Sequence, residues 1–293
     1  MKIILHNPGH NGDQLFTLGI IKQIISDNMD KNFTIIPSCS MYLFNELLSD
    51  NVTLENHPVI WNNTTNIIIN KNFISENYNI LWNYYEGNIY INLWKLLIYE
   101  NYNWISLANR ITFINNMLKE INNKTGIKIY FNCNNYKELI PTLPYININE
   151  IIKKIRLYNK KIIFFYNQNS CSGLESSYPE NTNEIIIKKL IDNYGEDHII
   201  ILSKPCNITN NNLINVETEF GIVPVIDGKN LIICANIANI CDKVYFKNNG
   251  GSLFILNQTN INNSNNVKYY LIGSNDYYDT ISNEYGLNVK LYK

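Results

Sequence analysis

Hydrophobic and polar positions follow two periods along this chain. Short apolar runs occur at Lys2–Leu5, Lys161–Tyr166 and His198–Leu202, and such runs are typical of buried parallel strands. From Leu15 to Ile25 the apolar residues recur instead at three- and four-residue spacing, which predicts an amphipathic helix. Strands that alternate with helices favour a mainly parallel sheet, so we predict an α/β protein.

The same order of elements begins again halfway along the chain. Pro141 and Pro144 interrupt the pattern, and a second strand, polar loop and helix follow from Lys161. A length of 293 residues suits two cores better than one. We therefore predict two Rossmann-like domains, residues 1–145 and 146–293, with a cleft between them.

The remaining elements are predicted from the same periods. Further strands are expected at 33–36, 67–69, 80–82, 128–131, 213–216, 243–246 and 268–272. Helices are expected at 40–48, twice within 88–122, from 185, at 231–240 and from 253.

Composition and the distribution of apolar residues limit the possible binding partners and the cellular compartment. The net charge of −1 gives no indication of nucleic acid or an anionic membrane as a partner. No apolar run approaches the roughly 18 residues of a membrane span. The opening run ends at His6, which leaves no signal-peptide core, so we expect a cytoplasmic protein. Six scattered cysteines without a CxxC pair predict buried thiols and no metal site.

The first polar loop is the strongest candidate for ligand binding. Two glycines let the backbone approach a ligand, and the start of the next helix favours polar or anionic groups. The loop contains neither GxGxxG nor a P-loop lysine, which excludes the usual nucleotide fingerprints. Asp13 can be a base or simply a helix cap, and both interpretations stay open. The candidate substrate-binding residues are His6, Asn7, Gly9, His10, Gly12 and Gln14.

A second loop, in the other half, is a candidate for binding a diphosphate. It joins a strand to a predicted helix through Gly-Gly and a serine. The alternative is an ordinary turn with Ser252 as the helix N-cap. Lys204 and Glu217 follow other strands and are candidates for a cation and a ribose contact, or are solvated. The candidates within the loop are Lys247, Asn249, Gly250, Gly251 and Ser252.

Both loops resemble segments of a known enzyme group. The strand that leads into Gly12-Asp13-Gln14-Leu15 resembles the opening of GT-B glycosyltransferases, especially the heptosyltransferase-like group. The segment from Asp242 to Phe254 is similar to the part of that group that meets the donor phosphates. The His-Leu-Ala that usually follows is replaced here by Leu253-Phe-Ile.

The resemblance implies a metal-independent glycosyltransferase without a cofactor. Its co-substrates would be a nucleotide-sugar donor and a glycan or small-molecule acceptor. Asp13 would deprotonate the acceptor hydroxyl in the N-terminal domain, and the second loop would hold the donor in the C-terminal domain. Two alternatives are a non-catalytic binding or scaffold protein of the same fold, and a nucleotide-sugar epimerase or hydrolase.

Overall fold

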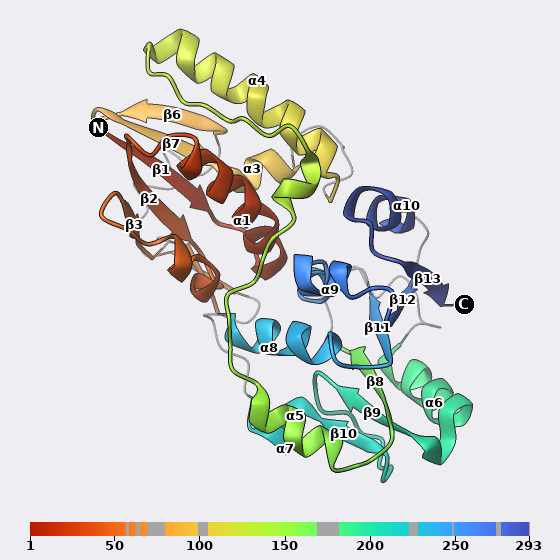
Figure 1. Cartoon of the computed structure of the whole chain (residues 1–293). Coiled ribbons are helices and arrows are strands. Elements are labelled where there is room, and N and C mark those ends of the chain that lie inside the picture. The colour runs from red at the N-terminus through yellow and green to blue at the C-terminus, as the bar shows by residue number, and fades with distance from the viewer. Residues whose placement is uncertain are drawn as a thin grey trace. The chain divides into compact units, whose positions relative to one another are not determined.

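The computed structural model describes most of the chain and divides it into two compact units. It covers residues 1–56, 59–62, 65–68, 80–98, 105–168, 182–222, 228–247, 249–273 and 277–292 (Figure 1). Unit 1 is Met1–Pro144 with Ile226–Gly228, and unit 2 is Tyr145–Val225 with Lys229–Lys293. Each unit contains its own largely parallel sheet, which confirms the predicted α/β class.

Unit 1 is built on a five-stranded sheet in the order β3-β2-β1-β7-β6. All neighbours are parallel except β6 and β7, which form a hairpin. Its turn is Glu86-Gly87, and both residues have positive φ, as a two-residue turn of this kind requires. The strands are β1 (Lys2–Asn7), β2 (Asn32–Pro37), β3 (Val52–Leu54), β6 (Trp82–Tyr85) and β7 (Asn88–Asn92). A separate antiparallel pair is formed by β4 (Val59–Asn62) and β5 (Thr65–Ile68).

Helix α1 (Asn11–Ser26) is the central helix of unit 1 and is buried along most of its length. It packs against three other helical segments of the unit, which are η1, α3 and η4. Gly19 lies so close to the backbone carbonyl of Leu139 that a Cβ would overlap with it, so a glycine is needed at this crossing. The other helices are η1 (Met41–Leu47), α3 (Leu93–Ile98), α4 (Leu107–Thr125) and η4 (Tyr136–Leu139).

Unit 2 contains a six-stranded, fully parallel sheet in the order β10-β9-β8-β11-β12-β13. Numbered within the unit, this order is 3-2-1-4-5-6, which is that of the Rossmann fold. The strands are β8 (Lys161–Tyr166), β9 (His198–Leu202), β10 (Leu213–Asn215), β11 (Lys243–Lys247), β12 (Lys268–Ile272) and β13 (Val289–Tyr292).

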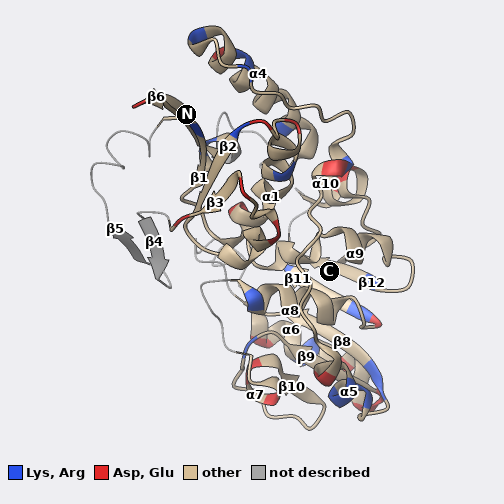
Figure 2. Cartoon of the chain, turned by 60° about the vertical axis from the view of Figure 1, so that its left-hand side comes forward, with Lys and Arg blue, Asp and Glu red and all other residues tan. Residues whose placement is uncertain are grey.

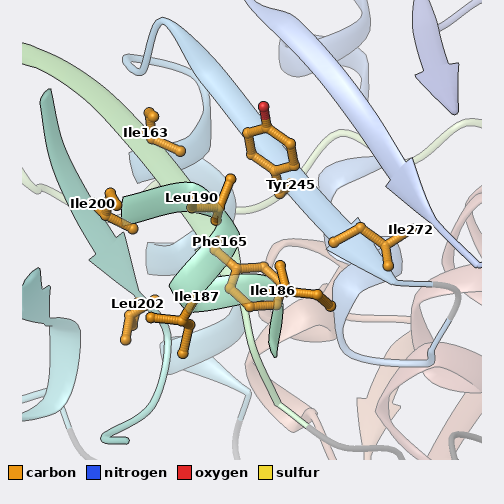
Figure 3. Close-up of a cluster of buried hydrophobic side chains, with 9 residues drawn as sticks. All are labelled: Ile163, Phe165, Ile186, Ile187, Leu190, Ile200, Leu202, Tyr245 and Ile272. Atoms are coloured by element: carbon orange, nitrogen blue, oxygen red, sulfur yellow. The ribbon is translucent and has the colours of Figure 1, made fainter. Parts of the chain in front are cut away.

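The core of unit 2 lies between this sheet and α6 (Asn183–Tyr194). Three apolar side chains of α6 pack on strand residues that alternate toward one face of the sheet (Figure 3). The cluster consists of Ile163, Phe165, Ile186, Ile187, Leu190, Ile200, Leu202, Tyr245 and Ile272. The remaining helices are α5 (Asn149–Arg156), η7 (Gly195–Asp197), α7 (Val216–Phe220), α8 (Lys229–Ala238), η8 (Ser252–Ile255), α9 (Gln258–Asn262), α10 (Tyr278–Thr280) and η10 (Ile281–Tyr285).

Several predicted elements differ from the observed ones. The strand expected at 128–131 is wrong, because the side chain of Asn28 takes the place of a neighbouring strand. Its Oδ1 accepts from Tyr130 N–H at 2.9 Å and its Nδ2 donates to Tyr130 O at 2.8 Å. The segment expected to be helical from 88 begins instead as β7, because Ile89 and Ile91 are fully buried beside β1.

The ends of other elements also shifted. The helices expected at 40–48 and from 253 are short 3-10 helices, η1 and η8. The strand expected at 80–82 begins at Trp82, and the one expected at 67–69 is β5, whose last described residue is Ile68.

Candidate functional site

The first candidate loop lies where the strand order of unit 1 changes direction. From β1 the chain continues to β2 and β3 on one side, whereas β7 lies on the other side. Ligands of open α/β sheets bind at the carboxyl ends of the strands at such a switch point. The loop from Pro8 to His10 leaves this end of β1 and leads into α1 (Figure 1).

Asn7 holds the loop in shape. Its Oδ1 accepts from Gly9 N–H at 2.8 Å, and its Nδ2 donates to Asp13 O at 3.1 Å and to Thr17 Oγ1 at 3.0 Å. The side chain is buried. Asn7 therefore joins the end of β1 to the first two turns of α1.

Gln14 supports the same loop from inside. Its Nε2 lies 2.9 Å from Asn7 O, 3.0 Å from Gly9 O and 3.1 Å from Ser38 Oγ, and the side chain is fully buried. Ser38 Oγ also donates to Gly9 O. The amide of Asn7 and Nε2 of Gln14 direct their hydrogen bonds to the protein itself, whereas Oε1 of Gln14 is buried without a partner among the described residues. Contact of Asn7 and Gln14 with a substrate stays a prediction.

Asp13 lies in the first turn of α1, and its carboxyl group faces back over the loop. Its Oδ2 accepts from His10 N–H at 2.8 Å, which is the capping interaction that the sequence allowed. A Cβ at Gly9 would lie 2.5 Å from this Oδ2 and 2.7 Å from Trp94 Cδ1. Gly9 is therefore required by the close approach of the Asp13 carboxyl and the Trp94 ring.

The surroundings of Asp13 tune its acidity. Burial raises the pKa of Asp13 from 3.8 to about 6, while the hydrogen bond from His10 N–H and the positive charge of Arg110 act in the opposite direction. A carboxyl group with such a pKa is ionised at neutral pH and is still basic enough to accept a proton. The position can therefore serve as a cap and as a base at the same time.

Arg110 is a residue that the sequence analysis missed. It is buried in α4, its Nη1 donates to Phe16 O at 3.1 Å, and its Cζ lies 4.4 Å from the centroid of the Phe16 ring. Phe16 is one turn after Asp13 on α1, so the guanidinium lies over the same part of the helix. The sequence feature that could have revealed Arg110 is its position on the apolar face of α4, in line with Ile114 and Ile121.

The other predicted residues of the first loop lie in β1 and at the start of α1. His6 is buried within β1, between Ile36 of β2 and Asn92 of β7. His10 is the N-cap residue of α1, and burial lowers the pKa of its imidazole. Gly12 is buried in the first turn of α1.

The second candidate loop lies at the corresponding position of unit 2. It follows β11 next to β8, where the Rossmann order changes direction. Asn249 Nδ2 donates to Gln168 O at 2.9 Å, which joins this loop to the one that follows β8. Asn248 lies outside the described residues, and Lys247 is buried.

Ser252 closes the second loop but does not cap a helix. Gly251 is the N-cap residue of η8 and Ser252 is its first residue, so the alternative assignment of Ser252 as N-cap is wrong. Ser252 N–H donates to Asn249 Oδ1 at 2.9 Å, and Ser252 Oγ donates to Lys247 O. A Cβ at Gly251 would overlap with the hydroxyl of Tyr166 and lie 2.9 Å from its Cζ. Gly251 thus allows close packing against the end of β8.

Lys204 and Glu217 follow the next two strands of the same sheet. Asn167, which the sequence analysis did not single out, follows β8 and joins the end of that strand to Lys204. Its Oδ1 accepts from Lys204 N–H at 2.8 Å, and its Nδ2 donates to Lys204 O at 2.9 Å. Glu217 N–H is capped by Asn215 Oδ1 at 2.9 Å. The structure therefore brings all predicted donor-binding residues to the carboxyl edge of one sheet.

Within the described ranges, no group of three or more His, Cys, Asp or Glu side chains is placed to hold a metal ion. Among the helices of the described part of the chain, none combines the length and apolar character needed to cross a membrane.

Two Rossmann-like units with loops at the carboxyl ends of their strands give the chain the fold of GT-B glycosyltransferases, as the resemblance predicted. No protein-family model and no curated protein matches the sequence. A solved glycosyl transferase family 9 protein from Veillonella parvula is similar in structure, with a TM-score of 0.52 and 11% identity. The match covers 99% of this chain and 85% of that one.

Two Escherichia coli structures are also similar. ADP-heptose LPS heptosyltransferase II has a TM-score of 0.45 at 11% identity, covering 100% of this chain and 90% of that one. Heptosyltransferase WaaC with ADP has a TM-score of 0.46 at 10% identity, covering 99% and 92%. At such low identities the similarity is one of fold.

Proposed function

We propose that this protein is a glycosyltransferase that moves a sugar from a nucleotide-sugar donor to an acceptor hydroxyl without a metal ion. The observation that carries the proposal is the Asp13 carboxyl group, whose pKa of about 6 and place after β1 suit a general base. The fold supports the proposal, because the solved protein that it resembles is named a glycosyl transferase.

In the proposed reaction Asp13 takes the proton of the acceptor hydroxyl. The hydroxyl oxygen forms a bond to the anomeric carbon of the donor sugar, and the bond from that carbon to the diphosphate breaks. The nucleoside diphosphate leaves with the electron pair. Within the described residues, His10 N–H binds Oδ2 of Asp13, which leaves Oδ1 for the acceptor.

The donor is proposed to bind at the carboxyl edge of the unit 2 sheet. Lys204 offers a cation there, next to the end of β8, and Gly250 adds a half-buried position without a side chain. Glu217 at the start of α7 is proposed to contact the ribose.

A non-catalytic binding protein is the second candidate. The side chains of Asn249 and Ser252 form hydrogen bonds within their own loop and its neighbour, which favours a loop that is structural rather than phosphate-binding. A nucleotide-sugar epimerase or hydrolase is the third candidate, and product analysis without an acceptor separates it from a transferase.

The test combines donor binding with the variant Asp13→Asn. A thermal-shift screen with UDP-, GDP- and ADP-linked sugars identifies the donor through the stabilisation that it causes. With that donor, we expect Asp13→Asn to lower turnover by about 10²- to 10⁴-fold and to keep the thermal shift, because the base and the donor site are different residues. The exposed, charge-matched variant Asp30→Asn should keep full turnover.

Two results would contradict the proposal. Turnover that survives Asp13→Asn removes the catalytic role of this carboxyl group. Absence of stabilisation by every nucleotide-sugar favours the non-catalytic protein instead.

A further inference from the structure

Basic side chains form a row along the amino edge of the sheet in unit 2. Lys161, His198, Lys243 and Lys268 are the first residues of β8, β9, β11 and β12. Lys161 pairs with His198, and Lys243 pairs with both Lys268 and Ile163. Paired residues of a parallel sheet share a face, and so do residues two apart on a strand. The four side chains, here named the basic row, therefore lie on one face of the sheet.

The basic row continues the face that α6 covers. The buried cluster of Figure 3 uses the same alternation, since Ile163, Ile200 and Tyr245 each lie two residues after a member of the row. Tyr194, at the end of α6, is the last large side chain before the row. Its ring centroid lies 4.4 Å from Lys243 Nζ and 4.9 Å from the ring centroid of His198.

A hollow with a volume of about 590 Å³ opens beside the basic row. Lys161 and His198 line it together with two further basic side chains, Arg156 at the end of α5 and Lys160. Figure 2 shows Lys and Arg gathered near α5 at this end of the sheet. The hollow lies at the amino ends of β8 and β9, whereas the proposed donor site lies at the carboxyl ends of the same strands. The two sites are therefore separate.

Two carboxylates, Asp197 and Asp242, also line this hollow and offset part of its positive charge. Asp242 Oδ2 accepts a hydrogen bond from Ile162 N–H at 2.7 Å, and its charge acts to raise the pKa of His198 and of Lys243. The lining cations Arg156, Lys160 and Lys161 outnumber these two carboxylates. In the part of the chain that the structure describes, ion pairs are formed by Asp30, Glu120 and Glu150 with neighbouring lysines, and none involves the basic row.

The cations of the row affect one another instead. Lys243 Nζ lies 3.3 Å from His198 Nε2, so the imidazole accepts this hydrogen bond and is neutral. Burial and then the charge of Lys268 lower the pKa of Lys243, and burial and then the charge of Lys243 lower the pKa of His198. An anion bound among these side chains would relieve that repulsion.

We propose that this hollow binds a small molecule with two or more linked phosphate groups. Three cations, Arg156, Lys160 and Lys161, line the hollow, and Lys243 and Lys268 of the basic row lie beside it on neighbouring strands. Such a group of cations fits a multivalent anion better than a single charge, and Arg156 can bind two phosphate oxygens at once. The volume lies within the range of roughly 300–1,000 Å³ that is usual for sites of metabolites.

The probes are inorganic pyrophosphate and tripolyphosphate, titrated into the full chain at constant ionic strength, with sulfate as the comparison anion. We expect both probes to raise the melting temperature and to bind more tightly than sulfate, because they contact more cations. Isothermal titration calorimetry gives the affinity.

The diagnostic variant is the double substitution Lys161→Gln with Lys243→Gln. It should weaken pyrophosphate binding by about tenfold or more, since it removes one cation that lines the hollow and one that lies beside it. The matched control Lys188→Gln with Lys189→Gln removes the same charge from the exposed side of α6 and should leave the affinity within about twofold. Without ligand, the diagnostic variant should melt at or above the wild-type temperature, because two mutually repelling cations are gone.

A second variant covers the case in which the double substitution disturbs folding. Arg156→Gln changes an exposed residue at the end of α5 and should also weaken binding. Equal binding to all variants, equal binding of sulfate, or absence of pyrophosphate binding would overturn the proposal. Loss of pyrophosphate binding in Lys204→Gln, but not in the variants of the hollow, would also overturn the proposal. That result would place the anion at the carboxyl edge of the sheet.

Discussion

Replacing Asp13 by Asn should stabilise the folded protein at neutral pH, although it removes the proposed base. Burial raises the pKa of this carboxyl group from 3.8 to about 6, so ionisation is harder in the folded chain than in the unfolded one. Asn keeps a side-chain oxygen that can accept the hydrogen bond from His10 N–H. The variant therefore removes the cost of burying a charge and retains the cap.

The size and sign of this effect follow from the two pKa values. Below pH 3.8 the carboxyl group is protonated in both states and costs nothing. As pH rises, the unfolded state loses its proton first, so the cost grows and is complete above pH 6. A shift of about two pKa units corresponds to roughly 3 kcal/mol at pH 8 and to roughly half of that at pH 5. The carboxyl group keeps some solvent contact, so these figures are upper values.

Urea unfolding of both proteins at several pH values between 5 and 8 measures the effect. The free energy of unfolding of Asp13→Asn minus that of the wild type should increase with pH. The control Asp30→Asn should show a small difference of opposite sign, because its hydrogen bond to Lys31 lowers the pKa of the exposed Asp30 carboxyl group. A difference that is constant or decreases with pH for Asp13→Asn would refute the reasoning.

Three further measurements test the packing of both units. Gly251→Ala should lower the free energy of unfolding by about 1–3 kcal/mol in urea, because the new Cβ overlaps with Tyr166; an unchanged midpoint would contradict this. Asn7→Ala should lower it by about 2–4 kcal/mol, since three hydrogen bonds are lost, two of them buried, and a thermal melt that matches wild type would disprove it. In peptide mapping after brief iodoacetamide treatment, Cys133 should react well before Cys234, because burial raises the pKa of the Cys234 thiol to about 12; equal labelling would count against the buried position.

The place of the candidate sites in the chain was predictable, because it depends on local patterns. An apolar run followed by a polar loop and helical spacing identifies β1, α1 and the loop that contains Asp13. The same reading identifies the loop after β11. Once both sheets were predicted to be parallel, residues after different strands, such as Lys204 and Gly250, were bound to meet at one edge.

What the side chains do within these loops depends on residues far away in the sequence. Gly251 was expected to admit a ligand, yet its missing Cβ leaves room for Tyr166, which lies on another strand. Arg110 reached the first turns of α1 only through the packing of α4. The spacing of nearby residues placed Arg110 on the apolar face of α4, but it named neither Phe16 nor Tyr166 as a partner.

The sequence by itself determined the class of fold, the position of both loops and the candidate base. The tertiary structure decided that the segment around Tyr130 is not a strand, that Asn7 and Gln14 support the first loop, and that burial tunes Asp13. The physical reason is that hydrophobic periodicity records only which side of an element faces the core. The packing of distant segments decides which partner each element meets in the core and how much water is excluded there.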